Sequence, residues 1–91
     1  MLLVLYDIQN DKLRTSLSKF LTKYGRRVQY SVFELKNSQR IIDNIKVEIE
    51  TKYQKKFSQA DSVLIYDVGD SSNIQRFGYP KNEETDLLIW E

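Results

Sequence analysis

The chain has 91 residues, of which 41% are hydrophobic and 30% are charged, and its formal net charge is +1. A chain of this length folds as one domain, and its composition is that of a globular protein. Cysteine and histidine are both absent, which excludes disulfide frameworks, thiol nucleophiles and hydrolases that depend on a histidine base. Any catalysis must therefore use carboxylates, hydroxyls, lysine, arginine or a hard metal ion.

The charges are unevenly distributed along the chain. Residues 1–56 contain twelve Lys/Arg and six Asp/Glu, whereas residues 57–91 contain two and seven. The basic half favours a polyanionic partner, although solvated lysine-rich helix faces would give the same count. No apolar run approaches the ~20 residues that span a bilayer, and no leader with a cleavage site opens the chain, so we expect a cytoplasmic protein without membrane contact.

The first half of the chain predicts strand, helix and strand. Residues 2–8 form a continuous apolar run, the pattern of a central strand covered on both faces. Apolar residues then recur at helical spacing over residues 13–24, with Asn10 or Asp11 as the cap and Gly25 placed to end the helix. Residues 26–35, rich in Val, Tyr and Phe, predict strand.

The second half predicts a longer helix and two further strands. Residues 38–55 have helical periodicity and begin with Ser38 as a cap. A strand is expected over 62–68, a loop with at most a short structured piece over 69–84, and a last short strand over 86–91.

This order of elements predicts an α+β sandwich close to the ferredoxin-like βαββαβ fold, with helices on one sheet face and an extra C-terminal strand. The chain would be a single domain with its core in residues 1–68 and a tail in residues 69–91. The fold needs two strands between the helices, so residues 26–36 either break near Tyr30 or form one long bent strand.

Two segments carry a specific resemblance: Tyr6-Asp7-Ile8, with Arg14 on the following helix, and the stretch from Tyr24 to Glu34, which reads YGRRVQYSVFE. Together with Asp61-Ser-Val-Leu-Ile-Tyr66 they resemble the CRISPR-associated endoribonuclease family, the small protein that accompanies the spacer integrase. The likeness covers residues 1 to about 68 and is loose after residue 69.

The resemblance implies a ferredoxin-like homodimer that bridges integrase subunits, binds DNA or, alternatively, RNA, and in some members has a magnesium-dependent nuclease activity. Family tails often add a strand to the partner subunit. The apolar residues 87–90, which end in Trp90, suit that interface role.

Asp7 is the main catalytic and metal-binding candidate. It lies where an apolar strand ends, and in a two-fold dimer one Asp7 carboxylate from each copy would face the other. Mg²⁺, with Mn²⁺ as an alternative, takes oxygen ligands and can activate water for attack on a phosphodiester. The resemblance also assigns metal binding to this position. Alternatively, Asp7 only caps the turn that follows.

The remaining candidates are a hydroxyl, three cations and two aromatic residues. Ser31 would orient a phosphate or a water as a second catalytic residue, or it is a small residue at a crowded dimer seam. Arg14, Arg26 and Arg27 would neutralise phosphates, or serve solubility or a partner contact. Base stacking by Tyr30 and Phe33 is less favoured than packing in the core or the interface.

Two functions follow and are compatible in one protein: a dimeric nucleic-acid-binding adaptor for the integrase, and a metal-dependent phosphodiesterase. Two other classes rank lower, namely a toxin-like messenger ribonuclease of related fold and a small-ligand regulatory domain. The motif Ser-Val-Phe-Glu at 31–34 argues against the first, and the missing glycine-rich effector turn argues against the second.

Overall fold

The computed structural model describes residues 1–78 of the chain. Four strands and two α-helices alternate as β1 (Leu2–Asp7), α1 (Asp11–Thr22), β2 (Gly25–Gln29), β3 (Val32–Leu35), α2 (Gln39–Glu48) and β4 (Ser62–Asp67). The helical run that begins with α2 continues through a π-helical turn, η1 (Ile49–Tyr53), and a 3₁₀ turn, η2 (Gln54–Lys56).

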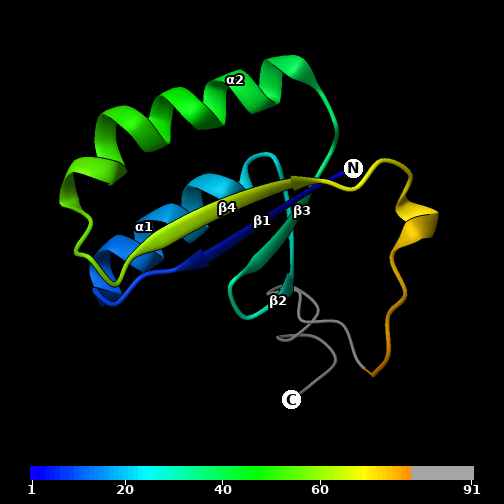
Figure 1. Cartoon of the computed structure of the whole chain (residues 1–91), viewed down its shortest axis with the longest axis horizontal. Coiled ribbons are helices and arrows are strands. Elements are labelled where there is room, and N and C mark those ends of the chain that lie inside the picture. The colour runs from blue at the N-terminus through cyan, green and yellow to red at the C-terminus, as the bar shows by residue number, and fades with distance from the viewer. Residues whose placement is uncertain (79–91) are drawn as a thin grey trace.

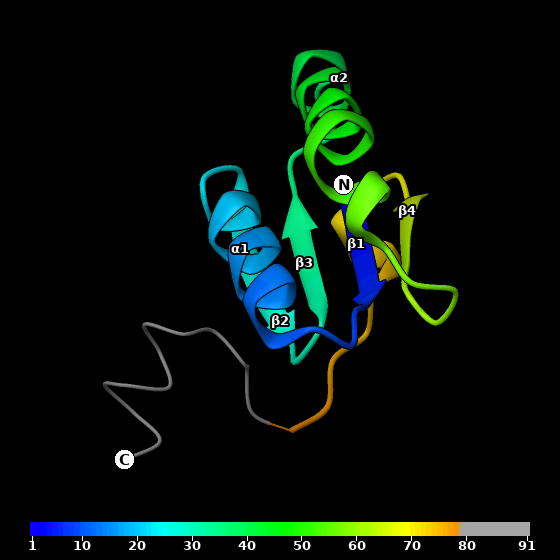
Figure 2. The same cartoon turned by 90° about the vertical axis from the view of Figure 1, so that its left-hand side faces the viewer.

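The strands form one sheet in the order β2-β3-β1-β4, and every neighbouring pair is antiparallel. Both helices lie on the same side of this sheet (Figure 1, Figure 2). The order and the helix placement are those of the ferredoxin-like βαββαβ fold, which confirms the predicted fold class.

The break predicted within residues 26–36 is present. β2 and β3 form a hairpin whose turn is Tyr30-Ser31, so the segment makes two strands rather than one bent strand. The register shifts between Arg27 and Gln29, which leaves Val28 as an extra residue on β2.

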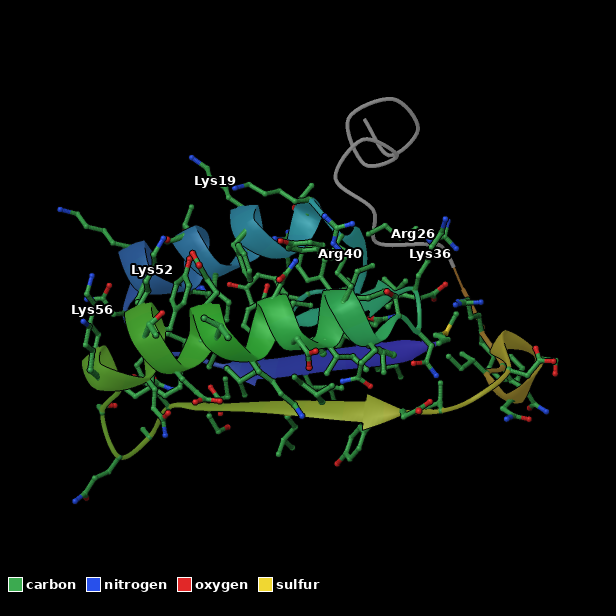
Figure 3. All side chains as sticks on the ribbon, turned by 90° about the horizontal axis from the view of Figure 1, so that it is seen from above. Lys19, Arg26, Lys36, Arg40, Lys52 and Lys56 are labelled. Atoms are coloured by element: carbon green, nitrogen blue, oxygen red, sulfur yellow. The ribbon has the colours of Figure 1, made fainter. Side chains whose placement is uncertain are left out.

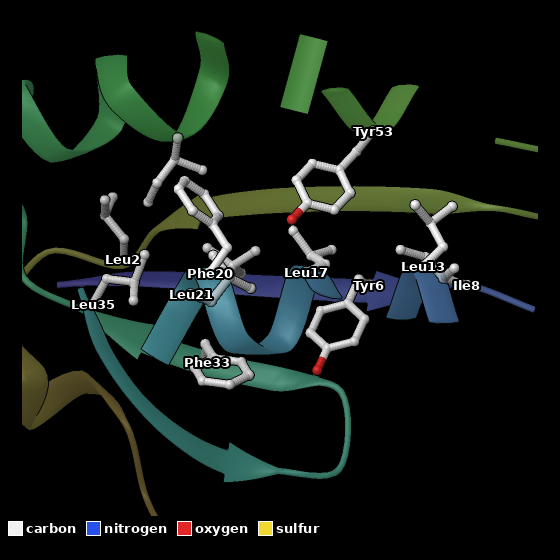
Figure 4. Close-up of a cluster of buried hydrophobic side chains, with 12 residues drawn as sticks. Leu2, Tyr6, Ile8, Leu13, Leu17, Phe20, Leu21, Phe33, Leu35 and Tyr53 are labelled. Carbon is white, nitrogen blue, oxygen red and sulfur yellow. The ribbon is translucent and has the colours of Figure 1, made fainter. Parts of the chain in front are cut away.

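The core fills the space between the sheet and the two helices (Figure 4). Alternate residues of each strand point into it, as the two-residue period of a strand requires. Leu2, Val4 and Tyr6 of β1 and Phe33 and Leu35 of β3 are buried there. The helices complete the cluster with Leu13, Leu17, Phe20, Leu21, Ile45 and Tyr53.

The other side of the sheet, here called the outer face, lacks such a cover within the described residues. Leu3 and Leu5 of β1 are only half-buried, and Leu64 and Tyr66 of β4 are 50% and 51% exposed. The expectation of a central strand covered on both faces is therefore not met within residues 1–78. β1 is central, but its apolar run includes residues that the described part of the chain leaves in contact with water.

Helix α1 begins as predicted and ends differently. The side chain of Asn10 accepts a hydrogen bond from the Leu13 backbone N–H at 2.9 Å, which satisfies one of the free donors of the first turn. The helix ends at Thr22, before Gly25, so the prediction that Gly25 terminates it is wrong. Gly25 begins β2, where a Cβ atom would lie 2.1 Å from the Glu34 carbonyl oxygen. Glycine is needed there for the close approach of two strands.

The second helical run agrees with the prediction for residues 38–55. The Ser38 side chain accepts a hydrogen bond from the Ile41 N–H and caps α2. After β4 the described chain forms a loop with one short 3₁₀ turn, η3 (Ser71–Asn73). The predicted strand at 86–91 and the interface role of Trp90 lie outside the described residues. Within residues 1–78 no helix is both long and apolar enough to cross a bilayer.

Candidate functional site

Asp7 is exposed at the end of β1, on the outer face of the sheet and opposite Ser62 of β4. Its carboxylate accepts a hydrogen bond from Gln9 Nε2 at 3.1 Å. It therefore keeps acceptor positions for a ligand, because one side-chain amide uses only part of the capacity of a carboxylate.

Asp61 holds the loop that follows Asp7. Its two carboxylate oxygens accept the backbone N–H groups of Gln9 and Ser58, each at 2.8 Å. These hydrogen bonds hold the pKa of Asp61 below its usual value, because they favour the charged form. Asp61 thereby fixes the residue whose side chain contacts Asp7. In the sequence Asp61 stands out only as part of a strand motif, although an Asp just before a strand is a signal for such a backbone-binding role.

Ser31 lies close to the same end of the sheet. The backbone N–H of Tyr6 donates to the Ser31 carbonyl oxygen at 3.1 Å, which joins the β2–β3 turn to the residue before Asp7. The structure thus brings the two predicted catalytic residues to one end of the sheet, and the proposed use of the Ser31 hydroxyl stays a prediction.

Arg14 is engaged within the chain. Its guanidinium donates to the Ile8 carbonyl oxygen at 2.9 Å and pairs with Asp11. The hydrogen bond to Asp11 raises the pKa of Arg14 above its ordinary value. In this position Arg14 braces the turn between β1 and α1, next to Asp7.

Arg26 and Arg27 lie on opposite faces of β2 and do not form one cluster. Arg26 is on the outer face, where it lies 3.7 Å from the Glu34 carboxylate, which Arg76 also contacts. Arg27 points towards the helices, where it donates to the buried Ser18 hydroxyl and lies 5.6 Å from the centre of the Phe33 ring. The fold thus separates two residues that the sequence groups together, because neighbours on a strand alternate sides.

Phe33 is 1% exposed and packs in the core against Tyr6, with ring centres 6.2 Å apart. It is inaccessible to a base. Tyr30 is 70% exposed at the tip of the hairpin.

Exposed cations from α1, from the loop before α2 and from the second helical run lie on one side of the molecule (Figure 3). We call this set the basic helix surface, and it comprises Lys19, Lys36, Arg40, Lys52 and Lys56. Such a surface attracts a polyanion through charge alone and without sequence preference.

The side chains suit Mg²⁺ only in part. The exposed carboxylate of Asp7 is a hard oxygen donor of the kind that Mg²⁺ prefers. Among the described residues, however, no three His, Cys, Asp or Glu side chains gather into a group that could hold a metal. Within residues 1–78, Asp7 is therefore a single candidate carboxylate without a cluster of metal-binding side chains around it.

The match to known proteins covers most of the chain. The family model described as CRISPR associated protein Cas2 matches residues 1–76. The chain is 40% identical over 67 residues to a CRISPR-associated endoribonuclease Cas2 of Methanospirillum hungatei, an alignment that covers 74% of this chain and 71% of that one. A Cas2 endoribonuclease of Synechocystis is 34% identical over 91 residues, which cover 96% and 95% of the two chains.

Two solved structures have the same architecture. The crystal structure of Streptococcus pyogenes Cas2 superposes with a TM-score of 0.69 at 27% identity, over 85% of this chain and 98% of that chain. A hypothetical protein from Thermus thermophilus gives a TM-score of 0.70 at 30% identity, over 90% and 95%. With the family model matching residues 1–76, these likenesses show that the chain belongs to the CRISPR-associated Cas2 family.

Proposed function

We propose that this protein acts in CRISPR adaptation as a homodimer that binds nucleic acid and bridges integrase subunits. We further propose that a nuclease activity dependent on Mg²⁺ or Mn²⁺ resides at the paired Asp7 carboxylates. The observation that carries the proposal is the outer face, which combines an apolar patch that no part of residues 1–78 covers with an exposed carboxylate at its end.

The apolar patch supports the homodimer. It lies on one face of the sheet and consists of Leu3, Leu5, Val32, Leu64 and Tyr66. A soluble monomer rarely leaves such a contiguous apolar set in contact with water. In a dimer with a two-fold axis through this face, the patch of one copy covers the patch of the other, and each copy contributes its own Asp7.

The basic helix surface supports nucleic-acid binding. It lies on the side of the sheet opposite to the outer face, so a dimer joined through its outer faces presents two such surfaces to solvent (Figure 3). Two separated basic surfaces suit a long, rigid polyanion such as a DNA duplex, with single-stranded RNA as the alternative ligand. Binding to the integrase is proposed from family membership alone, and a pull-down assay with the integrase tests it.

The nuclease part of the proposal gives each described group a defined role. The paired Asp7 carboxylates would hold the cation, which when bound neutralises charge on a phosphodiester and polarises it. Gln9 orients the Asp7 carboxylate through its 3.1 Å hydrogen bond, and Asp61 fixes Gln9. Ser31, at the same end of the sheet, would donate its hydroxyl proton to a phosphate oxygen.

The names of the relatives leave the substrate open, since the Methanospirillum protein is called an endoribonuclease and a Thermus thermophilus relative an endonuclease. The test is therefore cleavage of labelled single-stranded RNA and of duplex DNA, each with Mg²⁺, with Mn²⁺ and with chelator. Asp7→Asn removes the charge at the proposed site, and Asp43→Asn, at an exposed position on α2, is the matched control.

We expect metal-dependent cutting that Asp7→Asn reduces by at least about a hundredfold and that Asp43→Asn leaves unchanged. Cutting that is indifferent to Asp7→Asn would contradict the nuclease site. Absence of cutting combined with firm duplex binding would leave the adaptor part of the proposal alone. No described feature favours a toxin-like messenger ribonuclease.

A further inference from the structure

A groove lies between the start of α1 and the end of the second helical run, on the side of the molecule that carries the basic helix surface. It has a volume of about 530 Å³, and none of its eight lining residues is acidic. All of them except Leu13 are polar, namely Asn10, Lys12, Ser16, Lys52, Tyr53, Lys55 and Lys56.

Two hydroxyl groups meet in the groove wall. Ser16 Oγ and the Tyr53 hydroxyl oxygen are 3.0 Å apart and share one hydrogen bond, although Tyr53 is only 6% exposed. The pair carries two hydroxyl protons and uses one of them between its members. No other hydrogen bond of either hydroxyl occurs within residues 1–78, so one proton is available to an acceptor that enters the groove.

The π-helical turn explains why Tyr53 points inward. Residues 41, 45, 49 and 53 follow one another at four-residue steps, and each step rotates the side chain by roughly 40° around an ordinary α-helix. In η1 the Gln54 N–H bonds to the Ile49 carbonyl five residues earlier, and this wider turn reverses the rotation. Tyr53 thereby stays on the inner face, and Lys52, Lys55 and Lys56 remain around the groove.

The lysines around the groove outnumber the carboxylates that could neutralise them. Lys52 pairs with Glu48 at 3.1 Å, one turn earlier on the helix. A second hollow of about 450 Å³ shares Lys12 and Ser16 with the groove and extends it to Lys19. Its one carboxylate, Asp11, is paired with Arg14. Like charges that converge on a hollow raise the local concentration of anions there.

We propose that this groove is a phosphate-binding site that holds the backbone of the bound nucleic acid. The inference rests on the proposed nucleic-acid binding and assigns part of it to named residues. The lysine ammonium groups neutralise the phosphate, and the free proton of the Ser16–Tyr53 pair donates to one of its oxygens. The lysines at the end of the second helical run thus belong to a defined binding site and not only to a diffuse charged surface.

The test is duplex DNA binding by fluorescence anisotropy over a range of salt concentrations. The first variant is Lys55→Gln/Lys56→Gln, and its matched control is Lys23→Gln/Lys46→Gln, which removes the same charge from exposed positions outside the groove. The second variant is Tyr53→Phe, which keeps the buried ring and removes only the hydroxyl.

We expect the groove variant to bind at least about tenfold more weakly at low salt and to lower the slope of log K against log salt by about two. The control should lose less than about twofold. Tyr53→Phe should weaken binding by about three- to tenfold without changing the slope, because it removes a donor and no charge.

Each other outcome has one meaning. If the groove variant and its control bind alike, the groove is overturned and the proposed function stands. If only Tyr53→Phe has no effect, the hydroxyl pair is removed from the site. If the unaltered protein does not bind duplex DNA at all, the nucleic-acid part of the proposed function fails, and this inference fails with it.

Discussion

The inner and outer faces of the sheet are made by the same strands, yet within residues 1–78 only the inner face is covered. On the inner face Val4 and Phe33 are almost fully buried beneath two helices, whereas on the outer face Leu64 and Tyr66 remain half exposed. The alternation of side chains along each strand thus gives inward-pointing and outward-pointing residues different roles. Inner residues build the core, and outer residues form the proposed dimer contact and carry the proposed site at Asp7.

The largest effect on folding is expected from the inner face. Phe33→Ala removes a ring that packs against Tyr6 and Arg27, and we expect a loss of about 3–5 kcal/mol in the free energy of unfolding. Urea denaturation followed by circular dichroism measures it. Phe33→Leu retains more of the volume and should lose clearly less. Equal losses for the two variants would mean that the ring has no specific packing.

A smaller effect should separate the two neighbouring arginines. Arg27→Ala leaves the buried Ser18 hydroxyl without its partner and exposes the Phe33 ring, so we expect a loss of about 1–2 kcal/mol. Arg26→Ala, on the outer face, should change stability by less than about 0.5 kcal/mol, because the Arg26 side chain is 59% exposed and Glu34 keeps its contact with Arg76. Similar losses in the same urea experiment would contradict the assignment of the two side chains to opposite faces.

Asp61 should give a modest effect that depends on pH. Its pKa is lowered in the folded chain, so its contribution is fully present above the ordinary value of 3.8 and is lost as the pH falls through the lowered folded value. Asp61→Asn should therefore lower Tm at pH 7, and the difference from the unaltered protein should shrink as the pH falls below 3.8. Asp43→Asn serves as the control. A difference that stays constant with pH would exclude the charge of Asp61 as its origin.

The smallest effect on folding is expected from the outer face. Leu64→Lys should change the stability of the single chain by less than about 0.5 kcal/mol, because the side chain is already half exposed. The same change should abolish dimers in size-exclusion chromatography with light scattering, because it places two charges in an apolar interface. Stability must be compared at high dilution, where dimerisation contributes little. If the variant still forms dimers, the interface does not include Leu64 and lies on another surface.

Much of the fold could be predicted from local patterns. The apolar run of residues 2–8, the caps Asn10 and Ser38, and the helical spacing after each cap gave the right elements, because these signals act within a few residues. The role of Gly25 was misjudged. Glycine is required at position 25 because of the Glu34 carbonyl oxygen on the neighbouring strand, nine residues away in sequence. In the sequence, a glycine that ends a helix and a glycine that allows two strands to approach look the same.

The candidate site was predictable only where a local pattern marks it. Asp7 could be proposed because it ends a strand-like segment, and Ser31 because its hydroxyl lies within the stretch that carries the family resemblance. The roles of Asp61 and Tyr53 could not, since they depend on contacts to Gln9 and Ser16, which lie 52 and 37 residues away. The separation of Arg26 from Arg27 needed only strand alternation, and it was missed because the two were treated as one charge cluster.

The position of β1 has a consequence for the order in which the protein folds. β1 is made first, but its partners in the sheet, β3 and β4, both come later in the chain, and Leu2 pairs with Asp67. During synthesis the edge of β1 that pairs with β4 therefore stays open until residue 67 has left the ribosome. Closing so long a loop is slow, and an unpaired apolar strand is the part of a chain most prone to aggregate. Any shortening of the chain before β4 leaves that strand permanently open at one edge.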